Sequence, residues 1–385
     1  MKFLTRNIWI LSIISLFNDI ASEMLYPVMP VYLKSIGFSI VLIGVLEGVA
    51  EATAGLSKGY FGNLSDASGK RLPYVRSGYA FSAISKPLMA MFSFPLWIFT
   101  ARTMDKFGKG LRTAARDALL SDEATPETKG RVFGFHRAMD TMGAVIGPAC
   151  ALTFLIFYPG HYTTLFYLTF LPGIVTILFT YLIKEKQHER VIKLRPKFLD
   201  FIKYWKTAPP HYRKLTRALL LFTLFNSSDV FLLLKIKENG ATDSMVITVY
   251  IFYNIIYALF SLPMGIVADK AGMKPVLASG FIIFALVYAG MAFADNTTAF
   301  FILFFFYGIY AAATEGIAKA WISNICDKKE TATAIGTFTA FQSIAALIAS
   351  SLAGFIWYTA GANITFLVTG SVTFFVGLYI LSFKK

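Results

Sequence analysis

The sequence has few charged residues for its length, and this scarcity decides the class of protein. Asp, Glu, Lys and Arg make up 15% of the 385 residues, whereas a soluble protein of this size would have about 25%. Hydrophobic residues make up 56%, and the apolar runs repeatedly reach about 20 residues, the length that a helix needs to cross a bilayer. The composition excludes a soluble globular protein and predicts many membrane spans.

The sequence also has only two cysteines and four histidines, and it lacks a nucleotide-binding loop. Cys150 and Cys326 both lie inside apolar runs and do not indicate a disulfide framework. His136 and Asp140 have the i, i+4 spacing of a metal or acid–base pair, but no third ligand lies near them. No glycine-rich phosphate-binding loop occurs, so ATP is not the direct energy source. We therefore expect no metal, no cofactor and no enzymatic activity, because a membrane-embedded enzyme would need a nucleophile or a metal cluster.

The positive charge is present in abundance, and it lies between the apolar runs. The formal charge of +14 comes from basic residues in short connections, as the positive-inside rule expects, which argues against nucleic-acid binding. Most of it lies at both termini and in the connections 62–71, 121–130, 184–214 and 268–274. Both termini should therefore be cytoplasmic. The first apolar run contains acids and no cleavage site, so it should be retained as a span rather than removed as a signal peptide.

The expected fold is an all-α membrane protein with twelve transmembrane helices in two six-helix bundles. We place the spans at 8–33, 40–61, 73–93, 96–120, 131–157, 162–183, 215–236, 244–267, 274–294, 298–325, 331–356 and 361–382. Residues 1–183 form the N-terminal bundle, 184–214 a cytoplasmic basic linker, and 215–385 the C-terminal bundle.

The linker region is the most basic part of the chain. Residues 184–217 hold eleven Lys or Arg against three acids. Within it, apolar side chains recur at i, i+3, i+4 and i+7, at Phe198, Phe201, Ile202 and Trp205. Lys197, Lys203 and Lys206 lie alongside them, which is typical of an amphipathic helix on an anionic membrane surface. The alternative is a disordered basic loop.

An internal repeat supports the division into halves. GNLSDASGKR at 62–71 recurs as GIVADKAGMK at 265–274, and Gly110 and Gly130 correspond to Gly316 and Gly336. Duplicated halves are typical of secondary transporters, whose substrate site lies between the halves.

At 62–71 the sequence resembles the major facilitator superfamily, whose loop between the second and third helices reads roughly G-x-x-x-D-R/K-x-G-R/K-R/K. The matching residues are Gly62, Asp66, Gly69, Lys70 and Arg71, and Asp269 belongs to the weaker second copy. Ala67 replaces the usual basic residue. The resemblance implies a gate in which this loop latches the cytoplasmic side in one state. The alternative is a tight turn whose charges only set the topology.

The fifth span carries a second match. Gly134, Gly143 and Gly147-Pro148 resemble a glycine motif associated with antiporters of this superfamily, although Ala151 and Leu152 replace its final glycines. Small residues let helices approach closely, and Pro148 bends the helix, so this helix is expected to hinge or seal the cavity. The alternative is simple close packing.

The fourth span carries a charged stripe. Arg102, Asp105, Lys109, Arg112 and Arg116 recur at spacings of three and four, so they share one face of a helix. Each cation would cost about 2.5–3.5 kcal/mol in the middle of the lipid. The stripe must face a cavity or partner side chains.

The first and second spans carry acids at helical spacing, Asp19 with Glu23 and Glu47 with Glu51. In the superfamily, the first and fourth helices both line the central cavity, so the resemblance implies that these acids face the basic stripe. A buried carboxylate holds its proton more readily when no cation lies beside it, so a change of partner exchanges protons. We expect Asp19, Glu23, Glu47 and Glu51 to carry protons; the alternative is a set of structural ion pairs.

The remaining candidates are assigned by depth. Arg116, Asp117, Arg137 and Asp140 lie near cytoplasmic ends and are expected to gate, as are Gly147 and Pro148. The expected substrate contacts are Arg102, Asp105, Lys109, Arg112, Asn18, Asn226, Asp229, Tyr253, Asn254, Tyr257 and Glu315. A tyrosine stripe of this kind serves equally often in packing or interface anchoring.

These features predict a monomeric, proton-coupled transporter of the cytoplasmic membrane that moves a small organic solute. Its partners are the solute, protons and the lipid bilayer, and no nucleic acid. The fifth-span motif favours proton antiport with export. The alternative is proton symport that imports an anionic metabolite or a metal chelate such as a siderophore, which the excess of cavity cations favours. A channel would need neither the gate loop nor the repeat.

Overall fold

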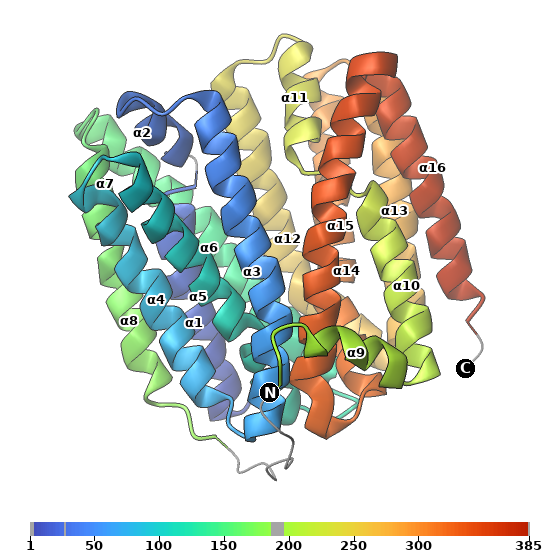
Figure 1. Cartoon of the computed structure of the whole chain (residues 1–385). Coiled ribbons are helices and arrows are strands. Elements are labelled where there is room, and N and C mark those ends of the chain that lie inside the picture. Colours follow the sequence, from blue (N-terminus) through green and yellow to red (C-terminus); the bar gives the residue numbers. More distant parts are fainter. Residues whose placement is uncertain (1–3, 27, 186–195, 384–385) are drawn as a thin grey trace. The chain divides into compact units, whose positions relative to one another are not determined.

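The computed structural model describes residues 4–26, 28–185 and 196–383, and all regular elements in these ranges are helical. Figure 1 shows the helices coloured along the sequence, from blue at the N-terminus to red at the C-terminus. They are α1 (Arg6–Glu23), α2 (Met29–Ser35), α3 (Ile40–Ser68), α4 (Leu72–Met91), α5 (Pro95–Asp122), α6 (Lys129–Phe157), α7 (Tyr162–Leu168), α8 (Phe170–Thr180), α9 (Asp200–Thr207), α10 (Pro210–Phe225), α11 (Val230–Glu238), α12 (Asp243–Ala271), α13 (Met273–Phe293), α14 (Thr297–Ile325), the 3-10 turn η1 (Lys328–Glu330), α15 (Thr331–Ala360) and α16 (Ala362–Leu381).

Eight helical stretches within the described residues are long and apolar enough to cross a membrane. They are α6, α7 with α8, α10 with α11, and α12 through α16. The helices α1, α3, α4 and α5 are absent from this group, although α3 and α5 have 29 and 28 residues. Of these four helices, α1, α3 and α5 carry the acids and cations that the sequence singles out. For α3 and α5, charge rather than length explains the absence.

Three spans predicted as continuous helices are interrupted, which corrects that prediction. The span 8–33 consists of α1 and α2, and 162–183 consists of α7 and α8, which meet at Thr169. The span 215–236 is broken after Phe225, and helix resumes only at Val230. Residues 226–229 read Asn-Ser-Ser-Asp, whose short polar side chains compete for backbone hydrogen bonds and disfavour a helix interior.

Contacts divide the chain into two compact units, each considered by itself. Unit 1 runs through Glu123 and adds Met139–Ala208 and Cys326–Ala340. Unit 2 comprises Ala124–Ala138, Pro209–Ile325 and the chain from Phe341 onward. The start of α15 thus belongs with the first half and the start of α6 with the second, at the positions that the internal repeat relates. The predicted bundles 1–183 and 215–385 remain a prediction.

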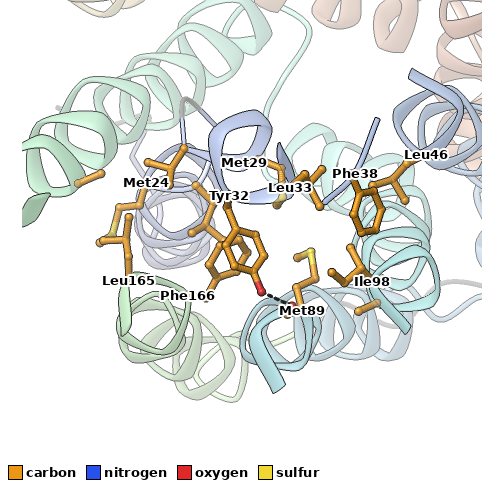
Figure 2. Packing of buried hydrophobic residues seen from close by; sticks show 14 residues of the cluster. Met24, Met29, Tyr32, Leu33, Phe38, Leu46, Met89, Ile98, Leu165 and Phe166 are labelled. Atoms are coloured by element: carbon orange, nitrogen blue, oxygen red, sulfur yellow. Dashed lines mark hydrogen bonds between the residues drawn. The ribbon is translucent and has the colours of Figure 1, made fainter. Parts of the chain in front are cut away.

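An apolar cluster in unit 1 fixes the end of α1 that carries the acids (Figure 2). Met24 and the buried residues of α2 pack against α4 and α7. Tyr32 lies with its ring centroid 4.7 Å from that of Phe166, and its hydroxyl donates to the carbonyl of Met89 at 3.3 Å. Close packing of these side chains fixes the helices through van der Waals contacts. The cluster therefore holds the acidic end of α1 in one place.

Unit 2 contains a cluster of stacked aromatic rings. Phe222 of α10 stacks on Phe281 of α13 at 4.2 Å, and Phe284 stacks on Tyr288 at 4.0 Å. Tyr307 and its neighbours on α14 complete the cluster. This cluster gives unit 2 a group of buried phenol side chains, Tyr288, Tyr307 and Tyr310.

Candidate functional site

A polar pocket in unit 1 lies between α1 and α5. It has a volume of about 90 Å³. Its lining consists of Asn18, Asp19, Ser22, Glu23, Leu25, Tyr26, Met29, Arg102, Asp105, Lys106, Lys109 and Arg112. The structure thus brings the acids of the first predicted span and the basic stripe of the fourth to the same cavity.

The second predicted acid pair is tied to α5 by ion pairs. Glu47 of α3 receives a bidentate contact from Arg102, from Nε at 2.8 Å and Nη2 at 2.9 Å. Glu51, one turn further along, pairs with Lys106. A bidentate guanidinium–carboxylate pair is among the strongest polar contacts that a protein makes. Glu47 and Glu51 therefore hold α3 against α5 in this conformation.

A buried ion pair lies behind the pocket. Lys86 of α4 is 2% exposed, and its Nζ contacts Asp105 at 3.3 Å and the Ser82 carbonyl at 2.9 Å. Asp105 also contacts Arg102 Nη1 at 3.4 Å. Asp105 thus pairs with two cations, and its contact with Lys86 joins α5 to α4.

Lys86→Met is expected to lower the free energy of unfolding by about 3–5 kcal/mol, because removal of one partner leaves a buried carboxylate poorly compensated. Unfolding of the purified protein in detergent measures the effect. The double variant Lys86→Met/Asp105→Asn should recover most of the loss. Lys109→Met, which alters an exposed lysine of the pocket, is the matched control and should change stability by less than about 1 kcal/mol. Equal losses in Lys86→Met and the control would contradict the pair.

Two cations of the pocket make no ion pair within the described part of the chain. Lys109 is exposed to the pocket. Arg112 is 4% exposed, donates from Nη1 to the Ser82 hydroxyl at 2.6 Å and lies 4.5 Å above the ring of Tyr79. Its buried Nε has no hydrogen-bond partner among the described residues. Lys109 and Arg112 are therefore available to an anionic group.

Two acids of the pocket are equally without an ion pair to any described residue. Asp19 accepts from Asn18 Nδ2 at 3.1 Å, and Glu23 lies one turn further along α1. Asp140 of α6 lies within hydrogen-bonding reach of Asp19. Two carboxyl groups can form that bond only when one of them carries a proton. A proton on either carboxyl would therefore change the contact between Asp19 and Asp140.

Two glycines of the fifth predicted span lie directly against these acids, whereas Gly134 lies against the Ser261 carbonyl of α12. A Cβ on Gly143 would lie 2.7 Å from the Leu16 carbonyl and 2.8 Å from the Asp19 Cβ. A Cβ on Gly147 would lie 2.8 Å from the Ile20 carbonyl and 3.0 Å from the Glu23 Cβ. Pro148 follows inside the helix. Close packing of α6 on α1 is thus what the glycines provide, and it brings Asp140 to Asp19.

A polar chain continues from Asp140 away from the pocket. The Ser15 hydroxyl donates to Asp140, and Arg116 Nη1 donates to the same hydroxyl at 3.3 Å. Arg116 also holds Asp117 through Nε at 3.0 Å and Nη2 at 2.9 Å. Arg116, Asp117 and Asp140 therefore form one buried network that links α1, α5 and α6.

The gate-loop residues contact the start of α15. Asp66 accepts from the Thr333 backbone N–H at 2.6 Å and from its hydroxyl at 2.8 Å. Gly62 lies against the Ala332 carbonyl, with no room for a side chain. Carboxylates stabilise helix N-termini because the backbone N–H groups there lack partners within the helix. Asp66 thus caps a helix that is distant in the sequence.

The other residues of the loop support Asp66. Arg71 contacts Asp66 at 3.4 Å and pairs with Asp122 at the end of α5. Gly69 ends α3 with a φ of 65°, which a glycine adopts without strain. Lys70 lies exposed in the turn.

Unit 2 contains the repeat-related counterpart of this contact. Asp269 accepts from the backbone N–H groups of Gly130 at 2.7 Å and Arg131 at 3.0 Å, and from Arg131 Nε at 2.6 Å. Gly130 and Gly265 approach so closely that neither has room for a Cβ. Asp269 thus caps the start of α6 as Asp66 caps the start of α15.

The break between α10 and α11 is lined by hydroxyl groups. The Tyr307 hydroxyl donates to Asp229 at 2.6 Å, and Asn226 Nδ2 donates to the Tyr310 hydroxyl at 3.2 Å. Tyr253 of α12 lies 5.0 Å from Tyr307, centroid to centroid. Asp229 is therefore held by phenols within unit 2.

The remaining second-half candidates lie along α12 and α14. Arg137 pairs with Glu315 and donates to the Tyr257 hydroxyl, so a residue predicted to gate and two predicted to bind solute form one cluster. Asn254 donates to the Tyr250 carbonyl of its own helix at 2.9 Å and is 5% exposed. Among the described residues, which include His136 and Asp140, no group of three potential ligands is placed to hold a metal ion.

Sequence reasoning missed several residues of the site. Lys106 lies one turn from Arg102 and from Lys109, so a second helical stripe through α5 would have included it. Lys86 is a lone cation in an apolar run, which is itself a signal. Tyr79, Ser82 and Ser15 carry no charge, and no spacing in the sequence distinguishes them from packing residues.

Comparison with known proteins shows a family to which the chain is similar. The family model described as Major Facilitator Superfamily matches residues 11–236 and 217–385. The chain is 32% identical to an uncharacterized MFS-type transporter of Methanocaldococcus jannaschii over 384 residues. This alignment covers 98% of this chain and 95% of the relative. A stretch of 128 residues is 30% identical to the multi-drug resistance efflux pump PmrA of Streptococcus pneumoniae, covering 33% of this chain and 32% of the pump. The crystal structure of the human organic anion transporter MFSD10 (TETRAN) has a TM-score of 0.83 at 15% identity, covering 97% of this chain and 99% of that one, which is a likeness of fold.

Proposed function

Because the chain belongs to the Major Facilitator Superfamily, and is thus a multi-pass membrane transporter and not an enzyme, we propose that it couples the movement of a small organic solute to protons. The proposed site of action is the cytoplasmic membrane. Counting α1–α2, α7–α8 and α10–α11 as one interrupted span each gives twelve spans. The basic connections then face the cytoplasm, and so do both termini.

The observation that carries this proposal is the set of unpaired charges in the α1–α5 pocket. Asp19 and Glu23 face Lys109 and Arg112 across one cavity, and none of the four makes an ion pair with a described residue. Fully paired charges would favour a purely architectural role. Unpaired charges of both signs can change partners when a proton or a solute arrives, and such exchange is what couples two binding events.

The coupling step follows from the contacts of Asp19. A proton on Asp19 allows its hydrogen bond with Asp140 and removes one negative charge from the pocket. Loss of that proton leaves a carboxylate beside Asp140 and opposite Lys109, which favours a rearrangement of α1, α5 and α6. Arg116 and Ser15 extend the same network. We assign Asp19 as the primary proton carrier and Glu23 as the second.

The helix caps supply the gate of the proposed cycle. Asp66 at the start of α15 and Asp269 at the start of α6 hold repeat-related contacts. In the proposed cycle, each carboxylate releases the N–H groups that it accepts from. Alternating access then amounts to making and breaking these caps while the pocket charges change partners.

Proton antiport with export is the direction that we favour. Gly143 and Gly147 place α6 against the proton-carrying face of α1, and a third of the chain is similar to an efflux pump. A solute with a cationic group would compete with the proton for Asp19 and Glu23. The second candidate is proton symport of an anionic solute, which the free Nε of Arg112 and the unpaired Lys109 favour. In unit 2, considered by itself, Asp229 and the tyrosines around it are also proposed to contact solute.

Transport into proteoliposomes with an imposed pH gradient tests the proposal. We expect uptake of at least one member of a panel of organic cations and anions to depend on the sign of the gradient. Uptake driven by an acidic interior indicates antiport, and uptake driven by an alkaline interior indicates symport. Saturable uptake that is indifferent to both gradients would contradict proton coupling.

A further inference from the structure

One face of the helix α9 packs against α3 and α15, the two helices that Asp66 joins. Phe201 is 2% exposed, and its ring lies so close to Gly59 of α3 that a Cβ there would be 2.7 Å away. The Thr337 hydroxyl of α15 donates to the Phe201 carbonyl at 3.2 Å. Tyr204 and Ala208 are buried on the same stripe. Through one residue, α9 therefore contacts both α3 and the start of α15, beside the helix cap that Asp66 makes. In Figure 1, α9 lies beside the lower ends of α3 and α15.

The other face of α9 is apolar and exposed. Phe198 and Leu199 in the turn before the helix are 50% and 52% exposed, and Ile202 is 42% exposed. Buried and exposed apolar residues thus occupy adjacent stripes of one short helix. A solvated surface helix would carry polar residues at these positions. The exposed stripe requires an apolar neighbour.

Basic residues flank that stripe. Lys197, Lys203 and Lys206 are exposed, and Asp200 is the one acid within residues 196–208. The ammonium of Lys203 lies 2.7 Å from Asp200 and holds the pKa of that carboxyl below its usual value. The backbone N–H of Lys197 also donates to Asp200, at 2.7 Å, but the ammonium groups of Lys197 and Lys206 make no ion pair with a described residue. Exposed apolar groups beside free lysines match the boundary between acyl chains and anionic headgroups.

The position of α9 in the chain points to the same surface. It ends at Thr207, and α10, the first part of a membrane-spanning stretch, begins at Pro210. A helix so close to a span lies at the depth of the headgroups. A soluble partner protein would have to displace lipid to reach it.

We propose that α9 is an interfacial strap, with its outer face bound to anionic phospholipid and its inner face holding α3 to the start of α15. This inference rests on the proposed gate only for its consequence, that anionic lipid stabilises the contact beside Asp66. Binding itself is independent of what the protein transports. Lipid that binds α9 lowers the rate at which the strap opens locally.

Hydrogen exchange of residues 196–208 in nanodiscs tests the proposal. The full-length protein is compared in phosphatidylcholine alone and in an equimolar mixture with phosphatidylglycerol. We expect slower exchange in the mixture, by roughly fivefold for each lysine that reaches the surface. Lys197→Gln/Lys206→Gln should abolish this difference while it leaves the Lys203–Asp200 pair intact. Lys34→Gln/Lys237→Gln, with the same loss of charge elsewhere, should retain it.

Two further variants keep the faces distinct. Ile202→Asn should speed exchange of the segment in both lipids, because it removes the outer apolar contact. Phe201→Ala should speed exchange by releasing the inner face, yet still show a slowing by phosphatidylglycerol. Equal exchange in the two lipids, or a lipid effect that the Lys197/Lys206 variant retains, would overturn the proposal. A failure of proton coupling would leave these rates unchanged, so the two proposals fail separately.

Discussion

Asp19→Asn is expected to reduce solute uptake driven by a pH gradient to the level of protein-free liposomes. Asparagine keeps the shape of the side chain and its contact with Asn18. Its amide does not titrate, so it cannot take up or release a proton beside Asp140. Solute binding and solute-for-solute exchange need no net proton movement, so they should remain measurable. Gradient-driven uptake and counterflow in the same proteoliposome preparation provide the two readings.

Asp295→Asn, the same substitution in an exposed connection, is the control and should leave uptake unchanged. Glu23→Gln tests the second acid of the pocket and should weaken coupling less than Asp19→Asn, because Asp140 lies within hydrogen-bonding reach of Asp19. Gradient-driven uptake by Asp19→Asn equal to that of the wild type would remove Asp19 from the proton path.

Asp66→Ala is expected to open the α3–α15 contact. The carboxylate accepts two hydrogen bonds from Thr333, and a hydrogen bond to a charged group contributes about 1.5–3 kcal/mol. Loss of either one shifts the equilibrium between closed and open by about 10- to 150-fold. Cys326 lies next to this contact, 3.8 Å from the Thr331 hydroxyl, and is a natural reporter. In a Cys150→Ser background, its reaction with a membrane-impermeant maleimide should accelerate by at least tenfold.

Asp66→Asn separates charge from shape in the same assay and should accelerate the reaction less than Asp66→Ala, because an amide oxygen can still accept a hydrogen bond. Asp295→Ala should have no effect. A labelling rate that stays at the wild-type value in Asp66→Ala would show that the cap does not hold the contact closed.

The charge pattern of the first half was legible in the sequence because charges in membrane helices are costly and therefore rarely incidental. Helical spacing put Arg102, Lys109 and Arg112 on one face, and the structure places them around one cavity with Asp19 and Glu23. Glu47 and Glu51, which are predicted to carry protons, contact Arg102 and Lys106 in this conformation. Which of several acids pairs with which cation depends on helix rotation and depth, and spacing along one chain does not determine either.

The breaks in the helices were not predictable from hydropathy alone. A window of apolar residues averages over Asn226–Asp229, although the run of short polar side chains there is a local signal. Lys86 illustrates the opposite difficulty. Its role depends on Asp105, which lies on the next helix, and no sequence spacing connects the two.

The internal repeat predicted more than a count of spans. It relates Asp66 to Asp269 and Gly130 to Gly336. In the structure, Asp269 caps the start of α6 at Gly130, and Asp66 caps the start of α15, the helix that contains Gly336. The exchange of the first turns of α6 and α15 between the two units follows the same relation. It could not be read from the sequence, because the repeat says which residues correspond and not which helices touch.

The most direct test of the account is to measure proton movement caused by solute. A pH-sensitive dye inside proteoliposomes reports whether adding a transported solute outside, with no imposed pH gradient, changes the internal pH. The account predicts a change with wild-type protein and none with Asp19→Asn, while counterflow of the same solute persists in both. Solute transport by the wild type with no change in internal pH, or an undiminished change with Asp19→Asn, would contradict it.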